Sequence, residues 1–172
     1  MSLHHKAFVF DYRRFNVELA PALLRALEIR SSDELRRLIN SNLESFRDPY
    51  EGEPLTRDWE ARLEFGNEHE VGDFALTKFY SPVLNLGLGS DWMDVDRALV
   101  SLGEGLGLTL LGTPFGPPEN PFDPGRTGSY FQSPEDVVRN LSDLRRARRT
   151  TAVERAEAIL KKAVGYGLYA TF

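Results

Sequence analysis

Residues 103–128 read GEGLGLTLLGTPFGPPENPFDPGRTG and hold seven of the chain's fourteen glycines and five of its ten prolines. From Gly112 onward the stretch has neither the period of a helix nor that of a strand. Loops of this length without regular structure are uncommon in compact domains, where they are usually functional or disordered. Phe115 and Phe122 lie among the prolines, and a solvated linker needs no aromatic side chains. We therefore expect residues 112–131 to form an ordered loop packed on the domain, with both phenylalanines largely buried.

Before this loop, the spacing of apolar residues predicts one strand and several helices. Residues 6–12 (KAFVFDY) are β-branched and aromatic with apolar residues on both faces, as in a strand. Residues 47–56 (RDPYEGEPLT) lack any regular period and are expected to form a loop. Apolar residues at three- and four-residue intervals predict helices over about 21–29, 31–46, 58–65, 67–80 and 90–102.

Capping residues specify where three of these helices begin. Ser31 with Glu34 and Asn67 with Glu70 have the spacing of a capping box, in which each side chain bonds to the backbone of the other residue. Ser90 stands directly before the last of these helices and has the place of its N-cap. The polar residues at these positions are thus explained by local structure.

After the long loop, the chain is expected to return to strands and helices. Residues 108–111 and 130–132 are expected to pair as strands on either side of the loop. Ser133 begins one helix, and Thr151 with Glu154 caps a second one. The inward-facing residues of these helices are predicted to be Val137, Val138, Leu141, Leu144, Val153, Ala156, Leu160 and Val164.

A strand at each end of the chain, over residues 6–12 and 168–172, suggests that the two termini share one sheet. The predicted fold class is therefore α+β, a single helix-rich domain over residues 1–172. Its small, mainly antiparallel sheet includes the N- and C-terminal strands. A chain of 172 residues fits one domain. Residues 1–5 are interpreted as disordered or as derived from an expression vector.

The composition narrows the class of protein. The chain has no cysteine, which excludes disulfides, thiolate metal sites and a cysteine nucleophile and is typical of a reducing compartment. No apolar run approaches the roughly 18–20 residues needed to cross a bilayer, and no signal peptide is recognisable. We therefore expect a cytoplasmic protein without a membrane partner.

The net charge of −5 is unevenly distributed. Residues 44–104 hold fourteen acidic and five basic side chains, whereas the two ends of the chain have a basic excess. A nucleic-acid-binding protein would have a net basic domain, so no nucleic-acid partner is expected. The acidic part either neutralises the basic ends within the fold or forms a face for a basic protein partner. In the second case residues 44–73 would steer association, and Glu51, Glu53 and Asp58 would contact the partner.

The segment His69–Asp73 has the first half of the zinc-protease helix motif, in which two histidines four residues apart bind the metal. Here the residue four positions after His69 is Asp73, and the two other histidines stand near the N-terminus. Carboxylates in a first helical turn are explained by the helix dipole.

The alternating glycines at 103–107 follow a predicted helix, the reverse of the order in a dinucleotide-binding turn. We therefore expect no metal and no cofactor.

One group of side chains in and after the long loop is a candidate contact site. Arg126 offers a rigid fork for a carboxylate or a phosphate, and aromatic side chains supply contact area at low entropic cost. Alternatively, the phenylalanines hold the loop on the core and Arg126 pairs with Asp123. The candidate contact residues are Phe115, Phe122, Asp123, Arg126, Tyr130 and Phe131.

The sequence carries no recognisable catalytic signature, and two functions are open. The first is a non-enzymatic interaction protein, of the inhibitor or immunity type, that binds a basic partner through its acidic surface and the 112–131 loop. The second is a small-molecule-binding protein or an unrecognised enzyme with a pocket under the same loop. A deep pocket holding Arg126 and Tyr130 would favour the second, and a flat or convex acidic surface the first. The oligomeric state is not specified by the sequence.

Overall fold

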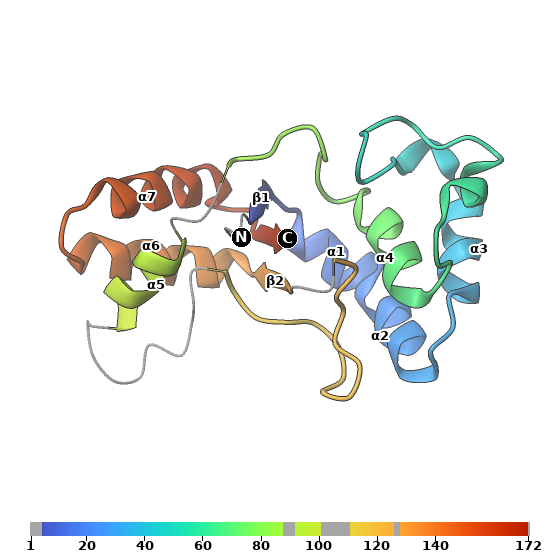
Figure 1. The fold of residues 1–172 in the computed structure, drawn as a ribbon, viewed down its shortest axis with the longest axis horizontal. Helices are drawn as coiled ribbons and strands as arrows, with labels where there is room; N and C mark the ends of the chain where they lie inside the picture. The colour runs from blue at the N-terminus through green and yellow to red at the C-terminus, as the bar shows by residue number, and fades with distance from the viewer. Residues whose placement is uncertain (1–4, 88–91, 101–110, 126–127, 172) are drawn as a thin grey trace.

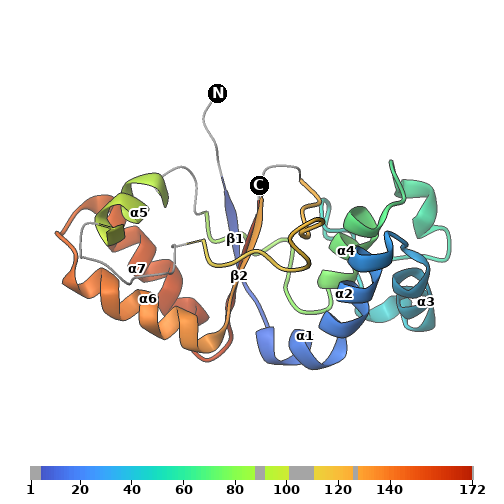
Figure 2. The same ribbon diagram turned by 90° about the horizontal axis from the view of Figure 1, so that it is seen from below.

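The computed structural model describes residues 5–87, 92–100, 111–125 and 128–171. Among these residues, the helices form two groups on either side of a central three-stranded sheet (Figures 1 and 2). One group consists of α1 (Tyr12–Glu18), α2 (Ala20–Ile29), α3 (Asp33–Ser41) and α4 (Glu68–Leu76), with the short 3-10 helices η1 (Leu43–Ser45) and η2 (Trp59–Arg62). The other group consists of α5 (Trp92–Val100), α6 (Pro134–Arg146) and α7 (Thr151–Ala163).

The sheet joins strands from the two ends of the chain, as predicted. Its order is β1 (Lys6–Val9), β3 (Leu168–Thr171), β2 (Ser129–Gln132), and both outer strands run antiparallel to β3. In this register, Lys6 lies opposite Thr171. The strand predicted over residues 108–111 falls almost entirely outside the described residues. Thr113, just after it, forms a single antiparallel bridge with Phe131.

Both faces of the sheet are buried, because alternate residues of each strand face opposite helix groups. The aromatic residues Phe8, Phe131 and Tyr169 lie in the core formed with α1–α4. The small residues Ala7 and Ala170 lie in a second core formed with α5–α7. The predicted fold class is confirmed: the chain is a helix-rich α+β domain whose small antiparallel sheet includes strands near both termini.

Helix α6 begins as the sequence predicts. The Asp136 N–H donates to Ser133 Oγ and the Ser133 N–H donates to Asp136 Oδ2, both at 3.1 Å, which completes a capping box. Helices α2, α4 and α7 also lie within one to four residues of their expected bounds. In the part of the chain that the structure describes, none of the helices combines the length and the apolar character that crossing a bilayer requires.

The chain near its N-terminus differs from expectation in two places. His5, interpreted as disordered or vector-derived, is buried and packs edge-on against Trp92, with ring centroids 4.9 Å apart. The strand ends at Val9 instead of residue 12, and α1 follows it. Asp11 is the N-cap of α1, because its carboxylate accepts a hydrogen bond from the Arg14 N–H.

The capping box expected between Ser31 and Glu34 does not form. Helix α3 begins after Ser32, one residue later than expected, and the Glu34 carboxylate binds the Arg25 guanidinium instead. An ion pair with a neighbouring helix thus replaces the local hydrogen bond. At α7, the N-cap is Thr150, one residue before the expected Thr151.

Two valines predicted to face the core are exposed. Val138 is 54% exposed and Val164 is 46% exposed. On α6, the buried residues include Val137, Leu141 and Leu144, so the helix presents the neighbouring position 138 to solvent. The spacing of apolar residues correctly predicted the helix. It did not specify whether position 137 or position 138 faces the core.

Candidate functional site

His69 and Asn120 fasten the long loop to α4. The Asp123 N–H donates to His69 Nδ1 (3.1 Å), so the ring proton lies on Nε2, which donates to Asn120 Oδ1 (2.8 Å). The Asn120 amide in turn donates to the Leu27 carbonyl (2.9 Å) and to Glu68 Oε1 (3.1 Å). Both ring nitrogens of His69 therefore hold the loop. Within the described residues, no group of three His, Asp or Glu side chains is arranged to hold a metal ion.

Phe122 is the main apolar contact between the loop and the rest of the fold. It is 1% exposed, and its ring lies 6.3 Å from the rings of both His69 and Phe131, measured between centroids. Phe115 is partly buried and meets Phe15 edge-on at 5.5 Å. The described part of the loop is thus packed on the α1–α4 core, and the predicted burial is complete for Phe122 and partial for Phe115.

A cleft of about 240 Å³ lies between this loop and the segment of residues 48–70, and we call it the loop cleft. Two aromatic side chains at its edge are exposed, Tyr50 by 66% and Phe65 by 58%. Its polar walls are formed by Arg62, Glu64, Asn67, His69, Glu70 and Asp123. Three carboxylates and one guanidinium therefore surround the loop cleft.

The Glu70 carboxylate shapes one wall of the loop cleft. It accepts hydrogen bonds from the backbone N–H groups of Glu64, Phe65 and Gly66, each at 2.7 Å. Asn67 accepts the Glu70 N–H at 2.9 Å, so half of the expected capping box forms. The other half is replaced, because Glu70 binds the preceding turn instead of Asn67. This turn presents Phe65 at the cleft. Because Glu70 already accepts three backbone hydrogen bonds, little of its carboxylate remains to bind a ligand.

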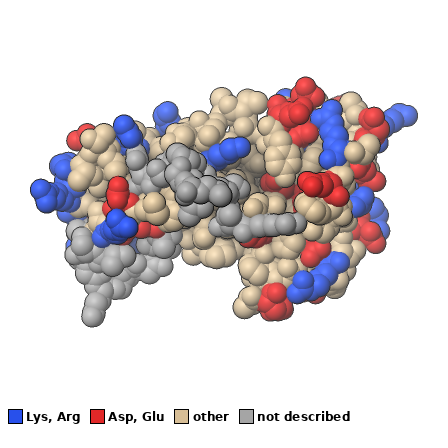
Figure 3. All heavy atoms as spheres, in the orientation of Figure 1, with Lys and Arg blue, Asp and Glu red and all other residues tan. Residues whose placement is uncertain are grey.

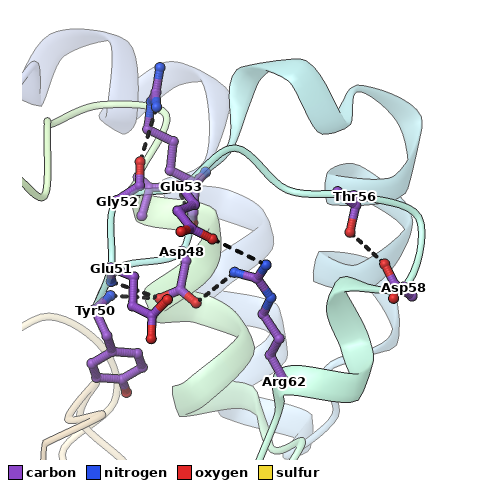
Figure 4. A network of polar contacts seen from close by, with 10 residues as sticks. Asp48, Tyr50, Glu51, Gly52, Glu53, Thr56, Asp58 and Arg62 are labelled. Carbon is purple, nitrogen blue, oxygen red and sulfur yellow. Dashed lines mark hydrogen bonds and ion pairs between the residues drawn. The ribbon is translucent and has the colours of Figure 1, made fainter.

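Arg62 is held by two carboxylates of the preceding loop (Figure 4). Its Nη1 donates to Asp48 Oδ2 (3.2 Å) and its Nη2 donates to Glu53 Oε2 (3.4 Å). Asp48 Oδ1 also accepts the N–H groups of Tyr50 (2.8 Å) and Glu51 (3.2 Å), which forms the turn that carries the Tyr50 ring. Because two carboxylates offset the guanidinium charge, Arg62 presents little repulsion to a cation in the cleft.

Two carboxylates of the loop cleft keep acceptor capacity for a ligand. Asp123 Oδ1 accepts the Gly128 N–H at 3.1 Å, and among the described residues Asp123 Oδ2 and the Glu64 carboxylate have no hydrogen-bond or ion-pair partner. The Tyr50 hydroxyl remains protonated, since partial burial of the side chain and then the charges of Asp73 and nearby carboxylates raise its pKa. The loop cleft is therefore an anionic site edged by aromatic rings.

The contact residues predicted in and after the long loop lie in different parts of the structure. Asp123 lies at the loop cleft, and Phe131 is buried in the α1–α4 core at 3% exposure. Tyr130 lines a hollow of about 320 Å³ together with Pro114 and other residues of the loop. Arg126, and with it the predicted pair with Asp123, lies outside the described residues. The predicted roles of these side chains in ligand or partner contact stay predictions.

The three predicted acidic contacts lie on the loop shown in Figure 4. Glu53 pairs with Arg62, and Asp58 accepts a hydrogen bond from the Thr56 hydroxyl, which lowers the pKa of Asp58. Glu51 is exposed and forms no ion pair within the described part of the chain. Glu51 and Asp58 are therefore the members of this set that form no ion pair within the described residues.

The exposed acidic surface is smaller than the count of carboxylates suggests. Of the ten carboxylates in residues 44–73, four are buried, namely Asp48, Glu68, Glu70 and Asp73. Glu68 in particular belongs to the core, because it is 7% exposed and binds Asn120. On the face shown in Figure 3, acidic and basic side chains are interspersed over the α1–α4 group. Local pairing thus neutralises part of the acidic region.

Sequence reasoning missed Tyr50, Arg62 and Phe65 as residues of a shared cleft. The segment RDPYEGEPLT was interpreted as a connecting loop, although an aromatic residue between proline and glycine in such a loop indicates a positioned ring. The approach of this segment to Asp123 depends on tertiary contacts that no local pattern contains.

Comparison with protein-family models, with curated proteins and with solved structures found no match. The loop cleft is therefore interpreted from its own geometry.

Proposed function

We propose that this chain is a non-enzymatic interaction protein that binds a basic protein partner, and that the loop cleft receives an arginine side chain of that partner. The observation that carries the proposal is the arrangement around one cleft of two exposed aromatic rings and two acceptors, Glu64 and Asp123 Oδ2, that have no partner among the described residues. A guanidinium stacks on aromatic faces and donates paired hydrogen bonds to carboxylates. Tyr50 and Phe65 would supply the faces, and the carboxylates the acceptors.

The volume of the loop cleft favours a side chain over a metabolite. Pockets for small molecules usually enclose roughly 300–1,000 Å³. The loop cleft encloses about 240 Å³, which suits a guanidinium and part of its methylene stem. The alternative, a small-molecule-binding protein or an enzyme with a pocket under the loop, would instead use the hollow of about 320 Å³ that Tyr130 lines.

The test is calorimetric titration of the full chain with two peptides, acetyl-Gly-Arg-Gly-Arg-Gly-amide and its citrulline counterpart. Citrulline has nearly the shape of arginine but no charge. We expect the arginine peptide to bind at one site, and the citrulline peptide to bind about tenfold more weakly, the sum of a cation–π contact and an exposed ion pair.

Two variants locate the binding site. Replacing both Tyr50 and Phe65 by alanine is expected to weaken binding of the arginine peptide about tenfold, because the aromatic faces are lost. Tyr166→Ala removes a similarly exposed ring, 56% exposed after α7, and is expected to leave binding unchanged. Equal affinity for the two peptides, or unchanged affinity of the double variant, would refute the proposed function.

We also expect association with a cationic partner to be steered by the acidic region. With the arginine peptide as probe, the association rate should fall as salt rises past 0.1 M, where the Debye length is roughly 10 Å. Reversing Glu51, Asp58 and Glu64 to lysine should slow association without unfolding the chain. Glu53 is left intact in this variant, because its reversal would place two cations together at Arg62.

The matched control reverses an exposed acid in the other helix group. Glu154 on α7 is exposed and forms no ion pair within the described residues, and Glu154→Lys is expected to leave the association rate unchanged. Stopped-flow fluorescence with a labelled peptide measures both rates. An association rate indifferent to salt and to the triple reversal would show that the acidic region is only a solvated face.

A further inference from the structure

His69 holds the end of the long loop by a contact that only the neutral imidazole can make. A backbone N–H can only donate a hydrogen bond, and the Asp123 N–H donates to His69 Nδ1 at 3.1 Å. Nδ1 therefore carries a lone pair, and the ring proton lies on Nε2, 2.8 Å from Asn120 Oδ1. In the imidazolium form both ring nitrogens carry protons, so two donors would face each other at Nδ1. Protonation of His69 thus breaks the bond to Asp123 and leaves the bond to Asn120.

The bond from Asp123 fixes one wall of the loop cleft. Within the part of the chain that the structure describes, it is the one hydrogen bond that joins residues 123–125 to α4. Earlier in the loop, the burial of Phe122 and the bond from Asn120 to a carbonyl of α2 do not depend on the charge of the ring. His69 and Asp123 both line the loop cleft, and the His69 side chain is 19% exposed, so a proton from solvent reaches the ring. A change in the charge of His69 therefore acts on the cleft wall.

Titratable side chains surround the ring on the elements that form the loop cleft, namely Tyr50, Arg62, Glu64, Glu68, Glu70 and Asp123. Glu68 Oε1 lies 3.6 Å from His69 Nε2 and attracts the imidazolium. Both residues belong to α4, so this attraction is present whether or not the loop is attached. The bond from the Asp123 N–H exists only in the attached loop, and the Asp123 carboxylate binds the Gly128 N–H. The ring therefore binds a proton more readily when residues 123–125 are detached, and protonation favours detachment to the same extent.

We propose that His69 is a pH-dependent attachment point, and that protonation of its ring detaches residues 123–125 from α4 and opens one wall of the loop cleft. Histidine is the side chain whose charge ordinarily changes between pH 5 and 8. The imidazolium also adds a positive charge at the cleft. Both effects lower the affinity for a cationic side chain as pH falls. This consequence for affinity rests on the function proposed above, whereas the detachment does not.

The first readout needs no ligand. In the ¹⁵N-labelled full chain, the ring nitrogens of His69 report its protonation, and solvent exchange of the Asp123 amide reports its attachment. After correction for the intrinsic pH dependence of exchange, protection of this amide is expected to fall about tenfold from pH 8 to pH 5.5, the loss of one hydrogen bond. A ring that stays neutral down to pH 5.5, or protection that is unchanged while the ring is protonated, would overturn the proposal.

Two variants assign the pH dependence to a residue. In His69→Asn, the side-chain oxygen takes the place of Nδ1 as an acceptor and does not titrate, so the pH dependence of Asp123 protection should disappear. Asp73→Asn is the matched control, because Asp73 lies one helical turn further along α4 and burial raises its pKa to about 7. In this control the pH dependence should persist. Persistence in His69→Asn, or loss in Asp73→Asn, would assign the effect to another group and overturn the role of His69.

The second readout is the affinity for the arginine peptide over the same pH range. Wild-type affinity should fall about fivefold from pH 8 to pH 5.5, the effect of one exposed like charge beside the peptide guanidinium, and His69→Asn should keep a constant affinity. A constant wild-type affinity while Asp123 detaches would overturn the link between this attachment and the cleft. Absence of binding at every pH would overturn the proposed function, and the exchange of the Asp123 amide would still decide the role of His69.

Discussion

Replacing Asp73 by asparagine is expected to increase the free energy of unfolding at pH 8 by about 4 kcal/mol. The folded-state pKa of Asp73 is raised to about 7, from 3.8 for a solvated aspartate. Between these two values the folded protein retains a proton that the unfolded chain has released. Stability from this group therefore falls as pH rises from about 4 to about 7 and stays low above that. Asparagine has the shape of the neutral acid and cannot ionise.

Urea denaturation at pH 5 and pH 8 measures this effect. The wild type is expected to lose about 3 kcal/mol between these pH values through Asp73, and the Asp73→Asn variant should lack this loss. Asp143→Asn, also at a buried carboxylate, is the matched control and should keep the wild-type pH dependence. An Asp73→Asn variant less stable than the wild type at pH 8 would show that the carboxylate is well compensated where it lies.

Replacing Phe122 by alanine is expected to lower the free energy of unfolding by about 3–5 kcal/mol, the usual cost of removing a buried aromatic ring. The side chain is 1% exposed and packs beside Phe131 in the α1–α4 core. Gly72 on α4 allows this approach, because a Cβ there would lie 2.9 Å from the Phe122 ring. The variant should also release the long loop, with faster hydrogen exchange at the Asp123 N–H that binds His69.

Tyr166→Ala is the control for this substitution, because its ring is 56% exposed and its loss should cost under about 1 kcal/mol. Urea denaturation gives the free energies, and hydrogen exchange measured by NMR gives the opening of the loop. A cost below 1 kcal/mol for Phe122→Ala would mean that the loop does not depend on this ring for its attachment.

Much of the fold follows from local sequence patterns. The aromatic runs at 6–12 and 168–172 predicted the paired terminal strands, and Ser133 with Asp136 specified the start of α6. The early end of β1 was not predictable, since the aromatic pattern continues through Tyr12. The strand ends where Asp11 caps α1 and its N–H donates to the Phe79 carbonyl (2.8 Å). That contact joins segments far apart in the sequence.

The candidate site could not be predicted from the sequence to the same extent, because its chemistry depends on which polar side chains are buried. Asp73 stands in a helix whose apolar residues predicted one buried face, yet α4 is buried on all sides from Glu70 onward. His69 resembled half of a metal motif, and its role, holding the long loop through Asp123, became visible only from the hydrogen bonds. The sequence predicted that the long loop packs on the core, as its described residues do, but did not predict the approach of the segment around Tyr50.

The central claim, that the loop cleft receives a cationic side chain, is tested most directly by intermolecular nuclear Overhauser effects. The labelled full chain is mixed with the acetyl-Gly-Arg-Gly-Arg-Gly-amide peptide, and contacts from the arginine Cδ protons are recorded. The expected result is a set of contacts to the ring protons of Tyr50 and Phe65 that the citrulline peptide does not give. Contacts located elsewhere on the surface, or the same contacts with citrulline, would contradict the claim.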